Sequence, residues 1–423
     1  MGKSHGILLQ ESMQEKIFAG AVLIITVLLC IGMPKISDKL KPESPFTQEF
    51  AEGIVEEVLE EDLSPDPIVQ GKFRGTQKLR VKILEGTHKN TEFEVYNTLS
   101  SLHSNFAYKG LKAVFTLRNS GGKTAVWLYN LKRDSHVFVL LGLFFAALVI
   151  LGRGQGLKSA LGLVFTCVLI VTVLIPALFA GFPPVPVSIG LVSIMTIVSF
   201  ILISGFTRKT YTAIAGTVSG ITIAGIISVI VSYSAQLSGV NMEGGEQLLN
   251  LAPDYNLKLD GLLFTSILIA SLGAVMDVSM SIASSMQEIL SANPRLSKKE
   301  LFQSGLTVGK DITGTMSNTL ILAFAGSSLP LVMMIWGYGM SFTQFINIPR
   351  IVIEIMHGIS GSIGIIAAVP CTALVALFIL RIPAAKKNAK IDGKYPYYYR
   401  EGIDHRSVQL VKETQKKCEG VCT

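Results

Sequence analysis

Residues 259–281 have the sequence LDGLLFTSILIASLGAVMDVSMS, and this stretch decides the fold class. It is as long as the roughly 20 residues that an α-helix needs to cross a bilayer, and it is apolar apart from a few polar residues such as Asp277. Comparable stretches recur along the 423-residue chain, which is 49% hydrophobic and 16% charged. An average soluble domain is roughly 25% charged. The sequence therefore predicts a helical protein that crosses a membrane several times.

Hydropathy and segment length predict about eight transmembrane helices. They lie at residues 17–33, 136–151, 157–180, 185–206, 211–235, 259–281, 313–336 and 348–380. No small-residue cleavage motif follows the first of them, so residues 17–34 are interpreted as an uncleaved signal anchor. Residues 135–380 then form a seven-helix membrane domain.

The basic residues of the short connections set the expected orientation. Lys and Arg occur in alternate connections, at residues 153–158, 208–209, 295–299 and 381–390, whereas the connections between these are uncharged or net acidic. This bias predicts that residues 1–16 and the tail 381–423 are cytoplasmic and that residues 45–132 lie outside. The net charge of +7 therefore indicates contact with membrane lipids and not with nucleic acid.

The external segment, residues 45–132, alternates apolar and polar residues in a way that is typical of half-buried β-strands. The clearest alternating sets lie at residues 79–83, 93–95, 113–117 and 126–129. Glycine-containing turns separate about five such strands, which suits a small closed barrel of the OB or SH3 type. We expect an assembly or gating module, with ligand binding as the alternative, because a fold alone does not give a function.

Polar residues inside the membrane-length stretches are the candidate functional residues, because a charge at mid-membrane costs at least a few kcal/mol. Asp277, Ser281, Ser284 and Glu288 follow helical spacing and share one face. In one interpretation, these residues line a water-filled pathway, and Asp277 is a proton or cation site. In the other, they are structural: Asp277 is paired with another residue, and Glu288 lies in a cytoplasmic extension of the helix that ends before Pro294.

The segment that follows carries a helix start signal. Ser297 with Glu300 forms a capping box, which predicts an amphipathic cytoplasmic helix over residues 295–308 that re-enters the membrane at Gly309.

Lys310, Asp311 and Asn318 lie near the start of the next span. Lys310 or Asp311 is placed to pair with Asp277 or Glu288 of the neighbouring helix. Such a pair either lines a transport route or fixes the register of two helices, and the sequence leaves both interpretations open.

Arg350, Glu354 and His357 form the third polar group. Arg350 and Glu354 are four residues apart and are predicted to pair along one helix. Glu354-x-x-His357 matches the ligand spacing of bundle metal sites, although a dinuclear site needs a second such motif. A proton relay or a divalent-cation ligand is one interpretation, and a cluster at the outer membrane boundary is the other. Gly358 and Gly361 either break the helix, as in discontinuous transporter helices, or serve packing.

Small residues also recur every four positions in the fifth predicted span, at Gly216, Gly220, Ala224 and Ser228. Such a stripe lets two membrane helices approach closely. We expect it to serve helix packing.

Two motifs resemble the YibE/F family of bacterial membrane proteins. They are GAVMDVSMSIASSM at residues 273–286 and VGKDI at residues 308–312, followed by NTLILAF at residues 318–324. The resemblance extends over nearly the whole chain. It implies a multi-pass protein of a bacterial cytoplasmic membrane that is often taken for a permease, and it supports the choice of Asp277, Asp311 and Asn318 without supplying a substrate.

No P-loop, Gly-x-Ser-x-Gly or His-Glu-x-x-His motif occurs, so we expect neither an enzyme nor a cofactor. The first hypothesis is a secondary transporter or channel that moves a small ion or solute by means of intramembrane carboxylates. The alternative is a non-transporting scaffold whose outer β domain recruits envelope or export partners. Under both hypotheses, association into a homo-oligomer stays open.

Overall fold

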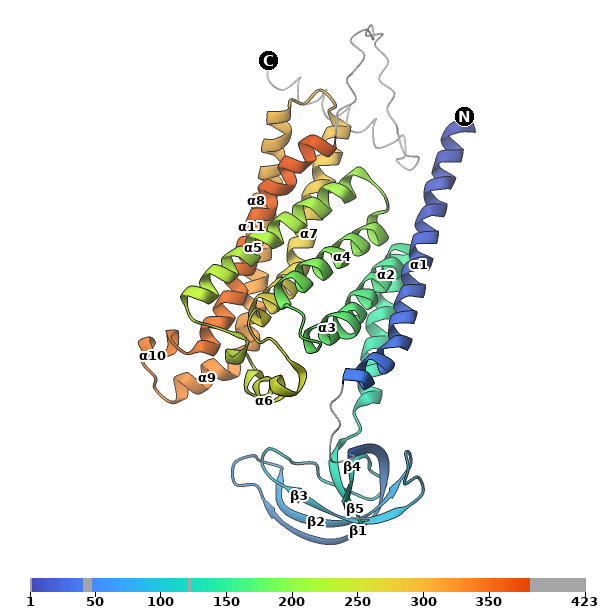
Figure 1. Ribbon diagram of the computed structural model, residues 1–423, viewed down its shortest axis with the longest axis vertical. Helices are drawn as coiled ribbons and strands as arrows, with labels where there is room; N and C mark the ends of the chain where they lie inside the picture. The colour runs from blue at the N-terminus through green and yellow to red at the C-terminus, as the bar shows by residue number, and fades with distance from the viewer. Residues whose placement is uncertain (1, 41–47, 121–122, 381–423) are drawn as a thin grey trace, which may run out of the picture. The chain divides into compact units, whose positions relative to one another are not determined.

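The computed structural model describes residues 2–40, 48–120 and 123–380, and the predicted cytoplasmic tail lies outside these residues (Figure 1). Helix α1 (Gly2–Leu40) comes first. The strands are β1 Gln48–Pro65, β2 Phe73–Ile83, β3 Glu92–Leu99, β4 Lys112–Ser120 and β5 Lys123–Leu131. The later elements are α2 Asp134–Leu169, the π-helical turn η1 Ile170–Leu174, α3 Ile175–Phe179, α4 Pro184–Ser204, α5 Arg208–Ser234, the 3-10 turn η2 Gly239–Asn241, α6 Gly245–Tyr255, α7 Leu262–Ala292, α8 Lys298–Ser327, α9 Leu329–Gly337, α10 Phe342–Ile346 and α11 Pro349–Ile379.

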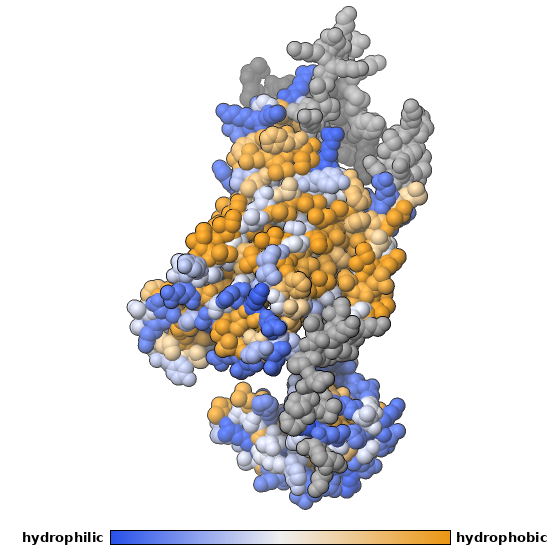
Figure 2. Space-filling model, viewed as in Figure 1, coloured by the Kyte–Doolittle hydropathy of each residue, from blue (hydrophilic) through white to orange (hydrophobic). Residues whose placement is uncertain are grey.

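The helices have the length and composition of membrane spans. Among the described residues, 6 helices are long and apolar enough to cross a membrane, and there are 7 spans if α8 and α9, which meet at a bend of 57°, count as one. On the face drawn in Figure 2, a broad hydrophobic band covers the helices, and hydrophilic residues gather at both ends of this band. The predicted class, a helical multi-pass membrane protein, is confirmed.

Helix α2 contains a bend that separates two of the predicted spans. Together with η1 and α3 it forms a stretch of 46 residues, which as one straight helix would be about 69 Å long, more than twice the bilayer core. At Arg153 the backbone leaves the helical conformation, with φ 47° and ψ −128°. A Cβ added to Gly156 would overlap the carbonyl oxygen of Leu148, because the chain folds back there. The bend thus divides α2 between the predicted spans 136–151 and 157–180.

The connections between the membrane helices gather at two ends of the bundle (Figure 1). We call one of them the α6 end, because it carries α6 together with α9 and α10. The turn between α3 and α4 also lies there, since a Cβ added to Gly181 would be 3.2 Å from the carbonyl oxygen of Asn256. The opposite end carries the short connections from α4 to α5 and from α7 to α8.

Helix α5 packs tightly on α11 in the centre of the bundle. A Cβ added to Gly216 would overlap Oγ1 of Thr372, and one added to Gly220 would lie 2.8 Å from Cβ of Ala368. Ala224 is fully buried in the same contact. Side chains this small let the two backbones approach closely, as the stripe in the sequence predicted.

Helix α8 differs from its predicted boundaries. It begins after Ser297, whose side chain and that of Glu300 form the predicted capping box. It then continues without a break through Gly309, so the predicted separate helix over residues 295–308 is wrong, and residues 298–308 are the first turns of α8. The reason is packing, because a Cβ added to Gly309 would overlap the side chain of Val369 on α11.

Helix α11 is likewise continuous where the sequence allowed a break. A Cβ added to Gly361 would lie 2.6 Å from Cδ2 of Leu320, so this glycine serves the contact between α11 and α8. The discontinuous helix is instead the pair α8 and α9, which meet at Ser328. Pro330 occupies the first turn of α9, a position that suits proline because it lacks a backbone N–H donor.

The β domain is one antiparallel sheet in the order β3-β2-β1-β4-β5. Strand β1 is long and pairs with both β2 and β4, and register shifts interrupt its pairing with β2. Val55, Leu79, Val81 and Phe115 are fully buried on its inner face, which confirms the predicted alternation. Between residues 48 and 131, as far as they are described, no ladder joins β3 to β5, so the sheet is open along this edge and is not the closed barrel that the sequence predicted.

A buried carboxylate ties the loop after β1 to the rest of the sheet. The side chain of Asp66 is inaccessible to solvent and accepts hydrogen bonds from Oγ of Ser101 at 2.5 Å and from Nε of Arg74 at 2.9 Å. It also accepts from the backbone N–H groups of Ile68 and Val69. The hydrogen bond from Ser101, followed by those from the other donors, holds the pKa of Asp66 well below its usual range.

Candidate functional site

Asp277 lies in the membrane-crossing part of α7. The helix has 31 residues with Asp277 at its midpoint, so any window of roughly 20 residues that crosses the bilayer contains it. The residue is exposed on the surface of the bundle. Its side chain makes neither an ion pair nor a hydrogen bond to any described residue. The interpretation of Asp277 as a paired structural carboxylate therefore finds no partner in the described part of the chain.

The face of α7 that carries Asp277 is made of polar and small residues. At helical spacing of three or four, this face comprises Ser266, Ala270, Gly273, Asp277, Ser281, Ser284 and Glu288. The opposite face is buried, with Val275, Val278 and Ile282 in the core of the bundle. Glu288 is exposed near the end of the helix at Ala292, which agrees with its placement in an extension of the span.

Helices α7 and α8 run antiparallel, and two contacts fix their register. A Cβ added to Gly305 would lie 2.6 Å from Sδ of Met286, so these two positions are level. Gly361 of α11 faces both Leu320 of α8 and Ser271 of α7, which makes that pair level as well. Both pairs give the same register.

This register brings the predicted polar residues of α8 close to the level of Asp277. Along the axis, Asp311 and Asn318 lie about 5 Å and about 6 Å from that level, on its two sides. Lys310 is level with Ser281. Lys310, Asp311 and Asn318 are exposed, and none of the three has a side-chain partner among the residues described. The structure thus brings Asp311 and Asn318 near the level of Asp277 along the axis, but the predicted ion pairs are not formed among the described residues.

Arg350 pairs with a residue that the sequence did not suggest. Its Nη2 lies 2.7 Å from Oε1 of Glu243, which follows η2 in the connection between α5 and α7. The predicted pair of Arg350 with Glu354 is wrong, because this connection folds over the start of α11 and offers a carboxylate there. The only hint in the sequence was the net acidic character of residues 236–258.

Glu354 and His357 lie together, one turn apart at the α6 end of α11. Nδ1 of His357 is 3.8 Å from Oε2 of Glu354, and Nε2 is 2.8 Å from Oγ of Ser266 on α7. The ring stacks on Phe324 of α8, with 5.3 Å between the ring centroids and 17° between the planes. Ser266 and Phe324 were not predicted, since nothing in a single sequence marks an ordinary serine or phenylalanine as a histidine partner.

Glu354 and His357 were also the weak candidates for metal binding. Among the described residues, no group of three or more His, Cys, Asp or Glu side chains is arranged to hold a metal ion. The two side chains therefore offer two ligands at most.

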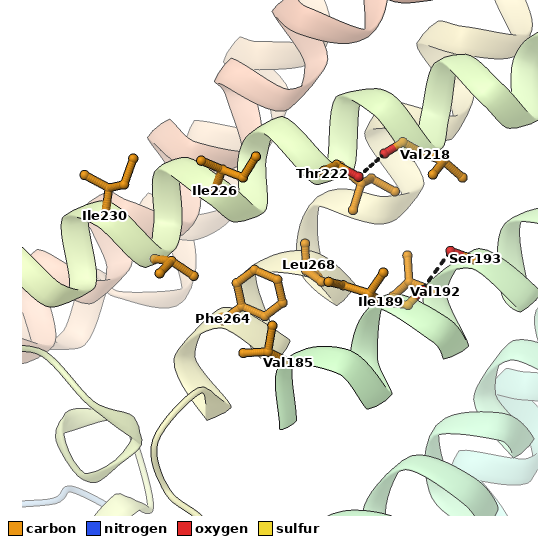
Figure 3. A pocket seen from close by; sticks show the side chains of 12 residues that line it. Val185, Ile189, Val192, Ser193, Val218, Thr222, Ile226, Ile230, Phe264 and Leu268 are labelled. Atoms are coloured by element: carbon orange, nitrogen blue, oxygen red, sulfur yellow. Dashed lines mark hydrogen bonds between the residues drawn. The ribbon is translucent and has the colours of Figure 1, made fainter. Parts of the chain in front are cut away.

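A cavity of about 250 Å³ between α4, α5 and α7 is apolar (Figure 3). Phe264 and Leu268 form one wall. Its two hydroxyl groups, on Ser193 and Thr222, each donate to a carbonyl oxygen of their own helix over 2.7 Å. Because no free polar group lines this space, it does not favour the passage of an ion.

The profile of the family described as YibE/F-like protein matches residues 140–382. The match runs from α2 to the end of α11 and includes every candidate residue described above, whereas the β domain lies outside it. No curated protein and no solved structure matches the chain. Because the match covers more than half of the sequence, the chain belongs to the YibE/F-like protein family.

Proposed function

We propose that this protein is a secondary transporter or channel that moves a small ion or solute across the membrane, and that it uses the charge of Asp277 to do so. One observation carries the proposal. A carboxylate lies within the membrane-crossing part of α7 on a polar face, and it has no partner among the described residues. An unpaired carboxylate at this depth is costly, so such residues usually serve ion or proton movement.

The neighbouring polar residues support a route along α7 and α8. Asp311 and Asn318 lie about one turn from the level of Asp277, and Ser281 continues the same face of α7 toward Glu288. In this proposal Asp277 binds the passing cation or proton, and the other side chains replace part of its water shell.

The same proposal includes an orientation. We place the α6 end and residues 45–132 outside the cytoplasmic membrane of a bacterium and both termini inside. The distribution of Lys and Arg supports this placement, because basic connections cluster at the opposite end. With the bend of α2 separating two spans, the chain crosses the membrane eight times.

The test is flux through the purified protein in liposomes. Electrical current and internal pH are recorded against a panel of monovalent cations, divalent cations and small anions. We expect a solute-dependent signal that Asp277→Asn abolishes. The matched control is Asp260→Asn, which makes the same chemical change just before α7, at an exposed position outside the helix. A signal that survives Asp277→Asn contradicts the role of Asp277, and silence of the folded wild-type protein across the panel contradicts transport.

A second candidate function, the scaffold, is favoured by exposed aromatic residues on the β domain. Phe50 of β1 and Tyr129 of β5 make an edge-to-face contact at 5.1 Å, and Trp127 is 47% exposed on the same side of the sheet. Exposed aromatic clusters are frequent at protein interfaces. In this proposal the strands form an open, OB-like half-barrel, which the pairing of β1 with both β2 and β4 supports.

The scaffold is tested by photo-crosslinking in cells from a reactive residue at position 127. We expect an adduct to a defined envelope or export protein that Phe50→Ser removes. A reactive residue at Asp62, which is exposed near the other end of β1 from Phe50, is the control. The same crosslinks from both positions, or none from position 127, argue against the scaffold.

A further inference from the structure

A second cavity lies at the α6 end of the bundle, between α8, the bend that leads into α9, and α11. Its volume is about 360 Å³. The side chains that line it are apolar except for Glu354 of α11 and Ser328 at the bend. A carboxylate is thus the main polar group of an otherwise apolar space.

His357 lies directly behind this carboxylate. The ring is only 8% exposed, and its Nδ1 has no hydrogen-bond partner. That nitrogen points toward Oε2 of Glu354 at 3.8 Å, which is too long for a hydrogen bond. The other ring nitrogen is held by Ser266 at 2.8 Å.

The hydroxyl of Ser266 decides where the histidine proton lies. A serine hydroxyl has one proton, and Oγ of Ser266 is also 2.8 Å from the carbonyl oxygen of Leu263, which can only accept it. Ser266 therefore accepts a hydrogen bond from Nε2–H of His357. In the neutral ring this leaves Nδ1 unprotonated, so that two acceptors, Nδ1 and the Glu354 carboxylate, face each other.

Two other charges, those of Arg350 and Glu243, act on Glu354 in opposite directions. Arg350 lies one turn before Glu354, but it is paired with Glu243 at 2.7 Å, so the pair adds no net charge. Helix α7 contributes Ser266, and α8 contributes Phe324, both uncharged. Within the described residues, the site therefore holds one net negative charge, which a single added proton removes.

We propose that Glu354 and His357 bind one proton between Oε2 and Nδ1, taken from water in this cavity, and that this proton is the coupling ion of the transporter. The last part rests on the transport function proposed above. A hydronium ion gives its proton to Nδ1 and becomes water, and the new N–H then donates to Glu354 as the two side chains close their 3.8 Å separation. Loss of the net charge makes the α6 end of α11 easier to move within an apolar environment.

Nitrogen NMR on the full-length protein in liposomes, labelled with ¹⁵N-histidine, tests proton binding without any transport assay. The chain has 6 histidines, and His357→Gln assigns the signal of interest by its loss. We expect Nε2–H with a bare Nδ1 in alkaline buffer and a doubly protonated ring in acidic buffer. In Glu354→Gln, the ring should become doubly protonated only in a more acidic buffer, because an amide stabilises the imidazolium less than a carboxylate does.

Two further variants serve as controls for the titration of His357. Glu246→Gln removes an exposed carboxylate of α6 without an ion pair among the described residues and should leave the titration unchanged. Ser266→Ala keeps both titrating groups, so the ring should still take up a proton but lose its fixed tautomer. A ring that keeps one protonation state at every pH, or that carries its proton on Nδ1 when neutral, overturns the proposal, as does identical titration of Glu354→Gln.

The flux assay separates the two proposals. If the wild-type protein moves a solute, we expect His357→Gln and Glu354→Gln to lose the dependence on a pH gradient while solute exchange persists. Coupling that survives both substitutions overturns the assignment of the coupling ion. If the wild-type protein moves nothing but His357 titrates as expected, the transport function fails and the proton site stands.

Discussion

At the scale of single residues, Asp66 makes the β domain sensitive to acid. Its pKa is lowered in the folded protein by the hydrogen bond from Ser101 and by the other donors around it. A lowered pKa means that the stabilisation is fully present above the ordinary aspartate value of about 4 and is lost as the pH falls below it. We therefore expect Asp66→Asn to lower the melting temperature at neutral pH and to flatten its decline in acid.

Tryptophan fluorescence measures this effect in the intact protein. The chain has 2 tryptophans, and with Trp336→Phe the remaining Trp127 in β5 reports on the β domain. Asp62→Asn, an exposed change on β1, is the control and should leave the acid decline as it is. Equal acid sensitivity of the wild type and Asp66→Asn contradicts the role given to this carboxylate.

The pair of Arg350 and Glu243 is a contact of small energy. The side chains are 44% and 78% exposed, and ion pairs this exposed contribute about 0.2–1 kcal/mol. We expect a double-mutant cycle with Arg350→Gln and Glu243→Gln to give a coupling within that range in thermal melts, and to shrink in high salt. A coupling of several kcal/mol that resists salt contradicts the geometry described above.

At the scale of elements, two glycines of α8 make it possible to measure the effect of helix packing apart from the effect of backbone flexibility. A Cβ added to Gly309 would overlap Val369, whereas Gly314 on the same helix has nothing within 4 Å. We expect Gly309→Ala to destabilise the folded protein by about 1–3 kcal/mol through overpacking. Gly314→Ala should be neutral or slightly stabilising, because alanine favours a helix more than glycine does. Thermal melts in one detergent compare the two, and equal melting temperatures contradict the contact.

The sequence predicts features that depend on residues within one helix better than features that depend on contacts between helices. The polar face of α7, the end of that helix after Glu288 and the capping box at Ser297 are patterns within one helix, and the structure has them as expected. Gly309 and Gly361 carry no such information, because a glycine that breaks a helix and one that packs against a neighbour look alike until the neighbour is known.

The candidate site shows the same division. Asp277 was found because a carboxylate in an apolar stretch stands out. Ser266 was missed because it lies 91 residues from His357 in the chain, and Glu243 because only the fold of its connection brings it to Arg350. Partners on different helices depend on helix register, which periodicity within one helix does not contain.

At the scale of the whole molecule, the proposed orientation predicts which positions are accessible from each side. In a protein without its 5 native cysteines, we expect Asp254→Cys and Phe342→Cys to react with a membrane-impermeant thiol reagent added to intact cells. Arg295→Cys should react only after the membrane is made permeable, because it lies between α7 and α8. The three positions are exposed, so labelling of all three from one side contradicts the arrangement of spans.

The small residues between α5 and α11 also bear on motion. Two helices in backbone contact over several turns cannot rotate against each other without colliding, so α5 and α11 behave as a rigid spine. Helix α8 also packs closely on this spine, because Val369 lies over Gly309 and Leu320 lies over Gly361. In the proposed transporter, a change of shape would then leave α5 and the part of α11 after Gly361 together as one body, and the bend of 57° at Ser328 would be the place where the bundle can flex.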